Sequence, residues 1–136
     1  MEQEIIIDAK GSVVGRLATF AAKQALQGKN VIVVNSEYAV IIGDPRKTFE
    51  DYVRKMKIGH GAQKGPFYPK QAYRILQRAI RGMLAHKSRH GAVAFRRVKC
   101  YESVPHAYSN KEKTKLAEAE AVKFITLKDL SRKLGK

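Results

Sequence analysis

The chain has little cysteine, no long apolar run and, over much of its length, almost no acid. Cys100 is the only cysteine, so an internal disulfide and a zinc site built from cysteines are excluded, and Cys100 is expected to be a small buried residue. The longest apolar runs, such as 31–34 and 39–42, cover a few residues, far short of the ~20 that a membrane-spanning helix needs. The N-terminus, MEQEIIID, lacks the basic start and apolar stretch of a secretory signal, so a cytoplasmic protein is expected.

What the chain does have is enough apolar residue for a core and a large excess of positive charge. Its 136 residues are 44% apolar and carry 27 Lys and Arg against 12 Asp and Glu, a net charge of +15. The length predicts a single core. We expect this core to be one α/β domain over 1–110, followed by an extension over 111–136 with a short helix. The charge predicts a polyanion as partner.

The positive charge is concentrated in one part of the chain. Residues 1–44 have four Lys and Arg and five acids, whereas residues 45–111 have 16 Lys and Arg and only three acids, a net of +13. No Asp or Glu occurs between Asp51 and Glu102. Because solvated helix faces normally mix Glu with Lys at i, i+4 spacing, this gap implies that a partner supplies the negative charge.

Apolar spacing predicts strands and helices in alternation, which is typical of an α/β domain with a mainly parallel sheet of about four strands. A Gly- and Pro-rich loop over 58–69 is the main candidate for a functional loop. The predicted elements are strands at 4–8, 31–34, 38–42 and 98–101, and helices at 13–27, 45–57, 72–84, around 93–95, and near the C-terminus with Leu127, Leu130 and Leu134 as docking residues.

The helix predicted over 72–84 has two stripes. Its core stripe should contain Ile75, Leu76, Ile80, Met83 and Leu84, at spacings of three and four residues. A second stripe is cationic, with Arg dominant, whose planar fork matches phosphate. The members of this second stripe are Lys70, Arg74, Arg78 and Arg81.

An alternative function is an α/β enzyme of nucleotide or nucleic-acid chemistry that uses the turn from Gly11 to Gly15. A Gly-rich turn between strand and helix can present amides to phosphate. The turn lacks the GxGxxG and GxxxxGK[ST] spacings, so the simpler interpretation has Ser12 as helix cap and Gly15 allowing close helix–sheet packing. The four histidines include the pair His86 and His90 at i, i+4 spacing, but neighbouring cations repel a metal, so neither metal nor catalysis is expected.

The resemblance to a known family rests on three stretches: IIIDAKGSVVGRLAT (5–19), GHGAQKGPFYP (59–69) and AIRGMLAHKSRHGAVAFRRVKCYESVP (79–105). In this order, over about 1–110, they resemble the universal large-subunit ribosomal protein L13 family, in its archaeal and eukaryotic branch. Ala85 stands where the family usually has Pro, and Cys100 where an aliphatic residue is commoner. The tail beyond Asn110 matches loosely.

The resemblance implies a three-layer α/β/α domain embedded in large-subunit ribosomal RNA, without catalytic activity, cofactor or small-molecule substrate. The expected partners are this RNA and neighbouring ribosomal proteins, and no membrane. The residues expected to contact RNA are Lys57, His60, Lys64, Lys70, Arg74, Arg78, Arg81, His86, Lys87, Arg89, His90, Arg96, Arg97 and Lys99.

Overall fold

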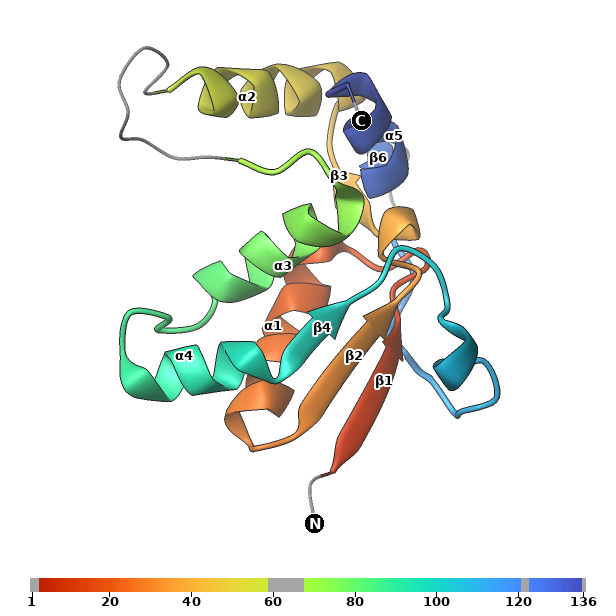
Figure 1. The fold of residues 1–136 in the computed structure, drawn as a ribbon. Helices are drawn as coiled ribbons and strands as arrows, with labels where there is room; N and C mark the ends of the chain where they lie inside the picture. The colour runs from red at the N-terminus through yellow and green to blue at the C-terminus, as the bar shows by residue number, and fades with distance from the viewer. Residues whose placement is uncertain (1–2, 59–67, 121–122, 136) are drawn as a thin grey trace.

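A four-stranded parallel sheet forms the centre of the molecule (Figure 1). The computed structural model describes residues 3–58, 68–120 and 123–135. The strands lie in the order β4 (Val98–Cys100), β2 (Asn30–Val34), β1 (Glu4–Asp8) and β5 (Thr114–Lys115). The prediction of an α/β fold with a mainly parallel sheet of about four strands is confirmed.

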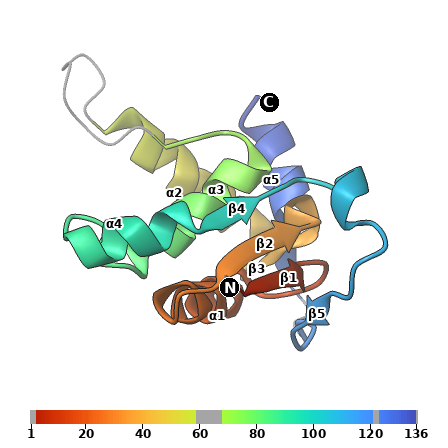
Figure 2. The ribbon, with the colours of Figure 1, turned by 60° about the horizontal axis from the view of Figure 1, so that its bottom comes forward.

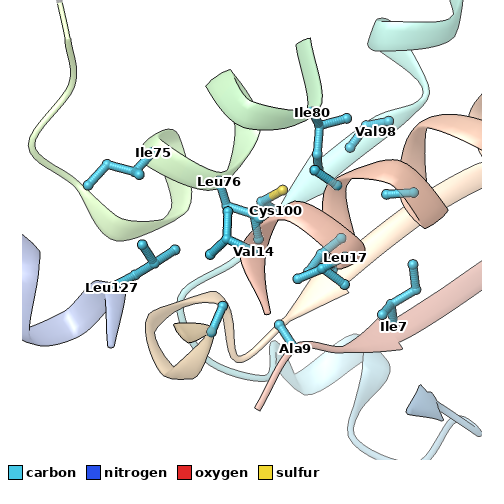
Figure 3. Packing of buried hydrophobic residues seen from close by; sticks show 14 of the residues in the cluster. Ile7, Ala9, Val14, Leu17, Ile75, Leu76, Ile80, Val98, Cys100 and Leu127 are labelled. Atoms are coloured by element: carbon cyan, nitrogen blue, oxygen red, sulfur yellow. The ribbon is translucent and has the colours of Figure 1, made fainter. Parts of the chain in front are cut away.

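Three helices, α1 (Val14–Leu26), α3 (Ala72–Gly82) and α4 (Arg89–Arg96), lie on one face of this sheet (Figure 2). Alternate strand residues point to opposite faces, so Ile7 and Cys100 join Leu17 and Ile80 in the main core (Figure 3). The spacing of apolar residues in α1 and α3 buries one stripe of each helix against this face. Cys100 is buried, as expected, and burial raises the pKa of its thiol to about 12.

The opposite face of the sheet is covered by a segment without a long helix. Ile6, Ile32 and Val34 form a second small cluster there. Tyr101 and Tyr108 pack against it, with ring centroids 6.1 Å apart. Tyr108 belongs to η2 (His106–Tyr108), a single 3-10 turn, so the third layer of the fold is thin.

One predicted strand lies elsewhere. The sequence predicts a strand over 38–42 as part of the main sheet, but Tyr38 ends the 3-10 turn η1 (Ser36–Tyr38), and only β3 (Val40–Ile42) is extended. β3 pairs antiparallel with β6 (Phe124–Thr126) in a separate two-stranded sheet. Helix α5 (Leu127–Lys133) follows, and Leu127 and Leu130 are buried in the main core.

Helix α2 (Pro45–Lys57) begins as predicted but lies away from the main sheet. The carboxylate of Asp44 accepts a hydrogen bond of 3.1 Å from the Arg46 amide and so caps the helix. α2 does not lie on the main sheet, because β3, from which it leaves, lies outside that sheet. None of its residues is fully buried, but its half-buried Phe49, Tyr52, Val53 and Met56 pack against the main core, and it contacts β6 (Figure 1).

Candidate nucleic-acid interface

Helix α3 carries the two stripes that its sequence predicts. Ile75, Leu76 and Ile80 are buried in the core, whereas Arg74 is exposed and Arg78 and Arg81 are half-buried. Leu84, the last residue of the predicted core stripe, is buried too, and Met83 alone departs from the prediction. Met83 is 50% exposed because α3 ends at Gly82 and the turn that follows leaves the Met83 side chain outside the core.

Arg78 is held against an aromatic ring. Its guanidinium carbon lies 4.0 Å from the centroid of the Tyr68 ring. Tyr68 meets Tyr52 of α2 edge-on, with centroids 6.3 Å apart at 81°, and the Lys55 ammonium lies 5.5 Å from the Tyr52 centroid and 5.9 Å from that of Tyr68. Burial raises the pKa of the Tyr52 hydroxyl, Tyr68 adds to this increase, and Arg78 opposes it. This cation–aromatic cluster joins α2 to α3 and fixes the position of Arg78.

A groove between α3 and α4 collects the predicted arginines. Its volume is about 230 Å³. The three arginines recur every three or four residues, so they lie along one side of α3. Phe95 of α4 supplies an apolar wall. We call this site the arginine groove; its lining residues are Pro69, Arg74, Gln77, Arg78, Arg81 and Phe95.

The turn between α3 and α4 is built by Ser88 and Gly91. The Ser88 hydroxyl donates to the Ala85 carbonyl at 2.7 Å and accepts from the Gly91 amide at 3.2 Å, which caps α4. A Cβ at Gly91 would overlap the Ala85 carbonyl, so this close approach requires glycine. With Ala85 in place of the family's usual proline, the path of 85–91 is thus a capped turn. It presents Lys87, Arg89 and His90 to solvent.

The other residues predicted to contact RNA differ in their exposure and in their place in the fold. Arg96 is exposed on α4, Lys70 is exposed just before α3, and Lys57 is exposed at the end of α2. His86 is half-buried in the turn before α4, so it does not share a helix with His90. His60 and Lys64 lie outside the described residues.

Two predicted residues point away from the arginine groove. Lys99 pairs with Ile32 in the sheet, which places its side chain on the face opposite the helices. Arg97 is half-buried and donates a hydrogen bond of 2.9 Å to the Ala25 carbonyl at the end of α1. Its guanidinium therefore satisfies a helix C-terminus.

Sequence reasoning missed a second cationic surface on α1. Arg16 and Lys23 are exposed, and with Gly15, Thr19 and Phe20 they line a shallow cavity of about 390 Å³. The Thr19 hydroxyl lies 4.0 Å from the Met83 sulfur, so this surface adjoins the end of α3. The i, i+7 spacing of Arg16 and Lys23 could have predicted that both lie on one side of α1. The low net charge of residues 1–44 drew attention away from this half of the chain.

The turn from Gly11 to Gly15 is not arranged to hold phosphate. The Gly11 amide donates to the Tyr38 carbonyl and the Ser12 amide to the Ala9 carbonyl, each at 3.0 Å. The Glu118 side chain packs beside Gly11 and would repel an anion. The predicted cap and packing roles are also wrong, because Val13 is the N-cap of α1. Within the described part of the chain, the buried Ser12 hydroxyl has no hydrogen-bond partner, and no atom lies within 4 Å of a Cβ position at Gly15.

Among residues 3–58, 68–120 and 123–135, no group of three or more His, Cys, Asp or Glu is arranged to hold a metal ion. Over the same ranges, no helix has the length and apolar character to cross a membrane.

Comparison with known proteins assigns the family. Residues 2–107 match the model of the family described as ribosomal protein L13. The chain is 40% identical to the large ribosomal subunit protein uL13 of Archaeoglobus fulgidus, over 96% of this chain and 86% of the relative. The proteins of the same name from Methanococcoides burtonii and Haloarcula marismortui are 41% and 39% identical, over 96% and 98% of this chain and 96% and 92% of the relatives.

These relatives are named as ribosomal proteins rather than enzymes, in agreement with the non-enzymatic role predicted from the sequence. The archaeal sources also agree with the predicted branch, and the chain belongs to the ribosomal protein L13 family.

Proposed function

We propose that this chain is a structural constituent of the large ribosomal subunit that binds large-subunit ribosomal RNA and helps it to fold and assemble. The similar proteins are named as large-subunit ribosomal proteins, and this role places the chain in cytoplasmic ribosomes beside other ribosomal proteins. Residues 1–110 serve as the RNA-binding domain, and the extension 111–136 packs β6 and α5 against it.

The observation that carries this proposal is a set of arginines without acidic partners. The printed sequence has no Asp or Glu from residue 52 to residue 101. Among the described residues, the ion pairs involve Arg46, Arg54, Lys111 and Lys115, and none includes a cation from Lys70 to Lys99. Like charges three or four residues apart on one helix repel each other and lower its stability. A bound polyanion would offset this repulsion, which is present in the free protein.

The mechanism is counterion release combined with shape recognition. Each phosphate that a Lys or Arg neutralises releases a condensed counterion, which favours binding at low salt. For each such phosphate, the logarithm of the binding constant falls by about 0.7–0.9 per tenfold rise in salt concentration. RNA helices are recognised mainly through their backbone and shape. The α/β core fixes α3 and α4 relative to each other, so it fixes the spacing of RNA strands that contact them.

Sucrose-gradient fractionation of cell lysate tests the proposal. The protein should sediment with large subunits and remain there after a high-salt wash, because many contacts hold it within folded RNA. Purified protein should also bind large-subunit ribosomal RNA with a steep salt dependence. Protein found only in the low-mass fractions, together with a salt slope near zero, would contradict the proposal.

A further inference from the structure

We propose that the arginine groove binds one unpaired nucleotide of RNA, with the base stacked against Phe95 and the phosphate held by Arg74 and Arg81. This inference rests on the proposed function and adds the RNA feature that the groove recognises. A surface that only neutralises phosphates needs neither a cavity nor an aromatic wall, and the arginine groove has both.

The size of the groove suits a single base. Its volume of about 230 Å³ lies below the ~300–1,000 Å³ of sites that hold drug-sized molecules. An RNA duplex is far too wide to enter. An extruded base brings a flat ring into such a cavity while its phosphate stays at the rim.

The charges of the groove suit a phosphate at that rim. Arg74 is exposed, Arg81 is half-buried, and both line the groove. Arginine binds phosphate through a planar fork of two N–H groups. Among the described residues no acid lines the groove, and the Gln77 amide offers both a donor and an acceptor to the edge of a base.

The walls of the groove suit a stacked base. Phe95 lines one side. Arg78 also lines the groove, and its contact with Tyr68 at 4.0 Å holds its planar group in place. Arg78 and Pro69 separate the groove from a second cavity, of about 180 Å³, that Tyr52 and Tyr68 line on the other side. RNA bases stack on aromatic rings and on guanidinium planes, whereas an acidic peptide gains nothing from the Phe95 ring.

The test compares two short RNAs that differ only in their bases. Fluorescence anisotropy would measure the binding of the whole protein to hexa-uridylate and to a hexamer of abasic ribose phosphates, which has equal charge. Phe95→Leu removes the aromatic ring and keeps most of the apolar volume. Phe124→Leu is the matched control, because Phe124 of β6 lines a cavity that an acidic residue, Glu118, also lines.

We expect Phe95→Leu to weaken hexa-uridylate binding about fivefold or more, as loss of one stacked base does. The same variant should leave binding of the abasic hexamer within twofold. Phe124→Leu should change the binding of neither RNA, whereas Arg74→Gln combined with Arg81→Gln should weaken the binding of both. Equal losses for the two RNAs, or no loss with hexa-uridylate, would overturn the inference. Hexaglutamate binding as tightly as hexa-uridylate, with the same loss on Phe95→Leu, would also overturn it and make the groove a peptide site.

A second measurement uses the unaltered protein and so does not depend on how a variant folds. Hexa-uridylate carrying 5-iodouridine is irradiated with the protein, and the cross-linked peptide is identified by mass spectrometry. A cross-link at Phe95 supports the inference, and cross-links confined to other surfaces contradict it. If these tests fail while the protein still binds large-subunit ribosomal RNA, the inference falls and the proposed function stands. If that binding is also absent, the proposed function falls.

Discussion

The first strand–helix–strand unit, residues 4–34, and the helical pair α3–α4, residues 72–96, use the same core but differ on their outer surfaces. In the first unit, polar side chains find partners within the fold: Lys29 donates to Gln24 at 2.8 Å, and Asp8 accepts from Asn35, which follows the unit, at 3.0 Å. In the second, the described lining of the arginine groove includes no acid. Burial stabilises both regions, but their charges differ: residues 4–34 have four Lys and Arg against two acids, whereas residues 72–96 have six against none.

This difference separates stability from binding at the level of single side chains. A buried Ile or Leu contributes roughly 1.5–3 kcal/mol through removal of apolar area from water. Like charges three or four residues apart cost a few tenths of a kcal/mol. Changes on the core stripe of α3 should therefore unfold the protein, whereas changes on its arginines should mainly alter RNA binding.

The largest effect is expected from the core stripe. Replacement of Ile75, Ile80 and Leu84 together by Gln should abolish cooperative thermal unfolding, since each loss costs about 2–5 kcal/mol and whole domains are stable by only ~5–15 kcal/mol. Circular dichroism during heating measures this directly. A sharp melting transition near that of the wild type would show that α3 does not depend on its core stripe.

A smaller loss should follow Gly91→Ala. The new Cβ would overlap the Ala85 carbonyl, so the turn must open, at about 1–3 kcal/mol. Urea unfolding gives the value. Gly82→Ala is the matched control, because no atom of the residues that the structure describes lies within 4 Å of its Cβ position, and alanine in a helix should add about 0.5–1 kcal/mol of stability. Equal effects at the two positions would contradict the close approach at Gly91.

Cys100 should make stability depend on alkaline pH. Its thiol has a pKa of about 12 in the folded protein against an ordinary 9, so the unfolded chain loses this proton first and unfolding becomes easier as pH rises from 9 towards 12. The free energy of unfolding of the wild type exceeds that of Cys100→Ala by some amount at pH 7. At pH 10 this difference should be about 1 kcal/mol smaller. A difference that stays constant with pH would contradict burial of the thiol.

The smallest effect on stability is expected at Arg97, and it tests whether this residue supports the fold or binds RNA. Arg97→Gln removes the hydrogen bond to the Ala25 carbonyl and should cost about 1 kcal/mol of stability. RNA affinity of the folded protein should stay within twofold of wild type. A loss of affinity as large as that of Arg81→Gln would return Arg97 to the interface.

The spacing of apolar residues along the chain was enough to predict most of α3 and α4 and the strands β1 and β2. The spacing of Ile75, Leu76 and Ile80 is enough to place α3 and its outward arginines, because both stripes follow from helical geometry alone. The strands at 4–8 and 31–34 follow from their β-branched runs and Gly turns.

Features set by distant contacts could not be predicted in this way. β3 lies outside the main sheet because its partner, β6, comes more than eighty residues later in the chain. The direction of Lys99 depends on its register with β2, and the role of Arg97 depends on where α1 ends. The arginine groove itself needs Phe95 of α4 beside Arg81 of α3, a contact that no local spacing reveals.

We expect Arg74 and Arg81 of α3 to bind RNA without supporting the fold, whereas Arg78 also packs on the Tyr68 ring. This is tested most directly by the binding of large-subunit ribosomal RNA across a salt series to a variant with Arg74 and Arg81 changed to Gln. A control variant has Arg132 and Lys133 changed to Gln, which removes the same charge from exposed positions elsewhere. Melting should be nearly unchanged in both, and the α3 variant alone should bind more weakly, with a salt slope shallower by about one to two. Wild-type binding and slope in the α3 variant, or equal losses in the two variants, would contradict this expectation.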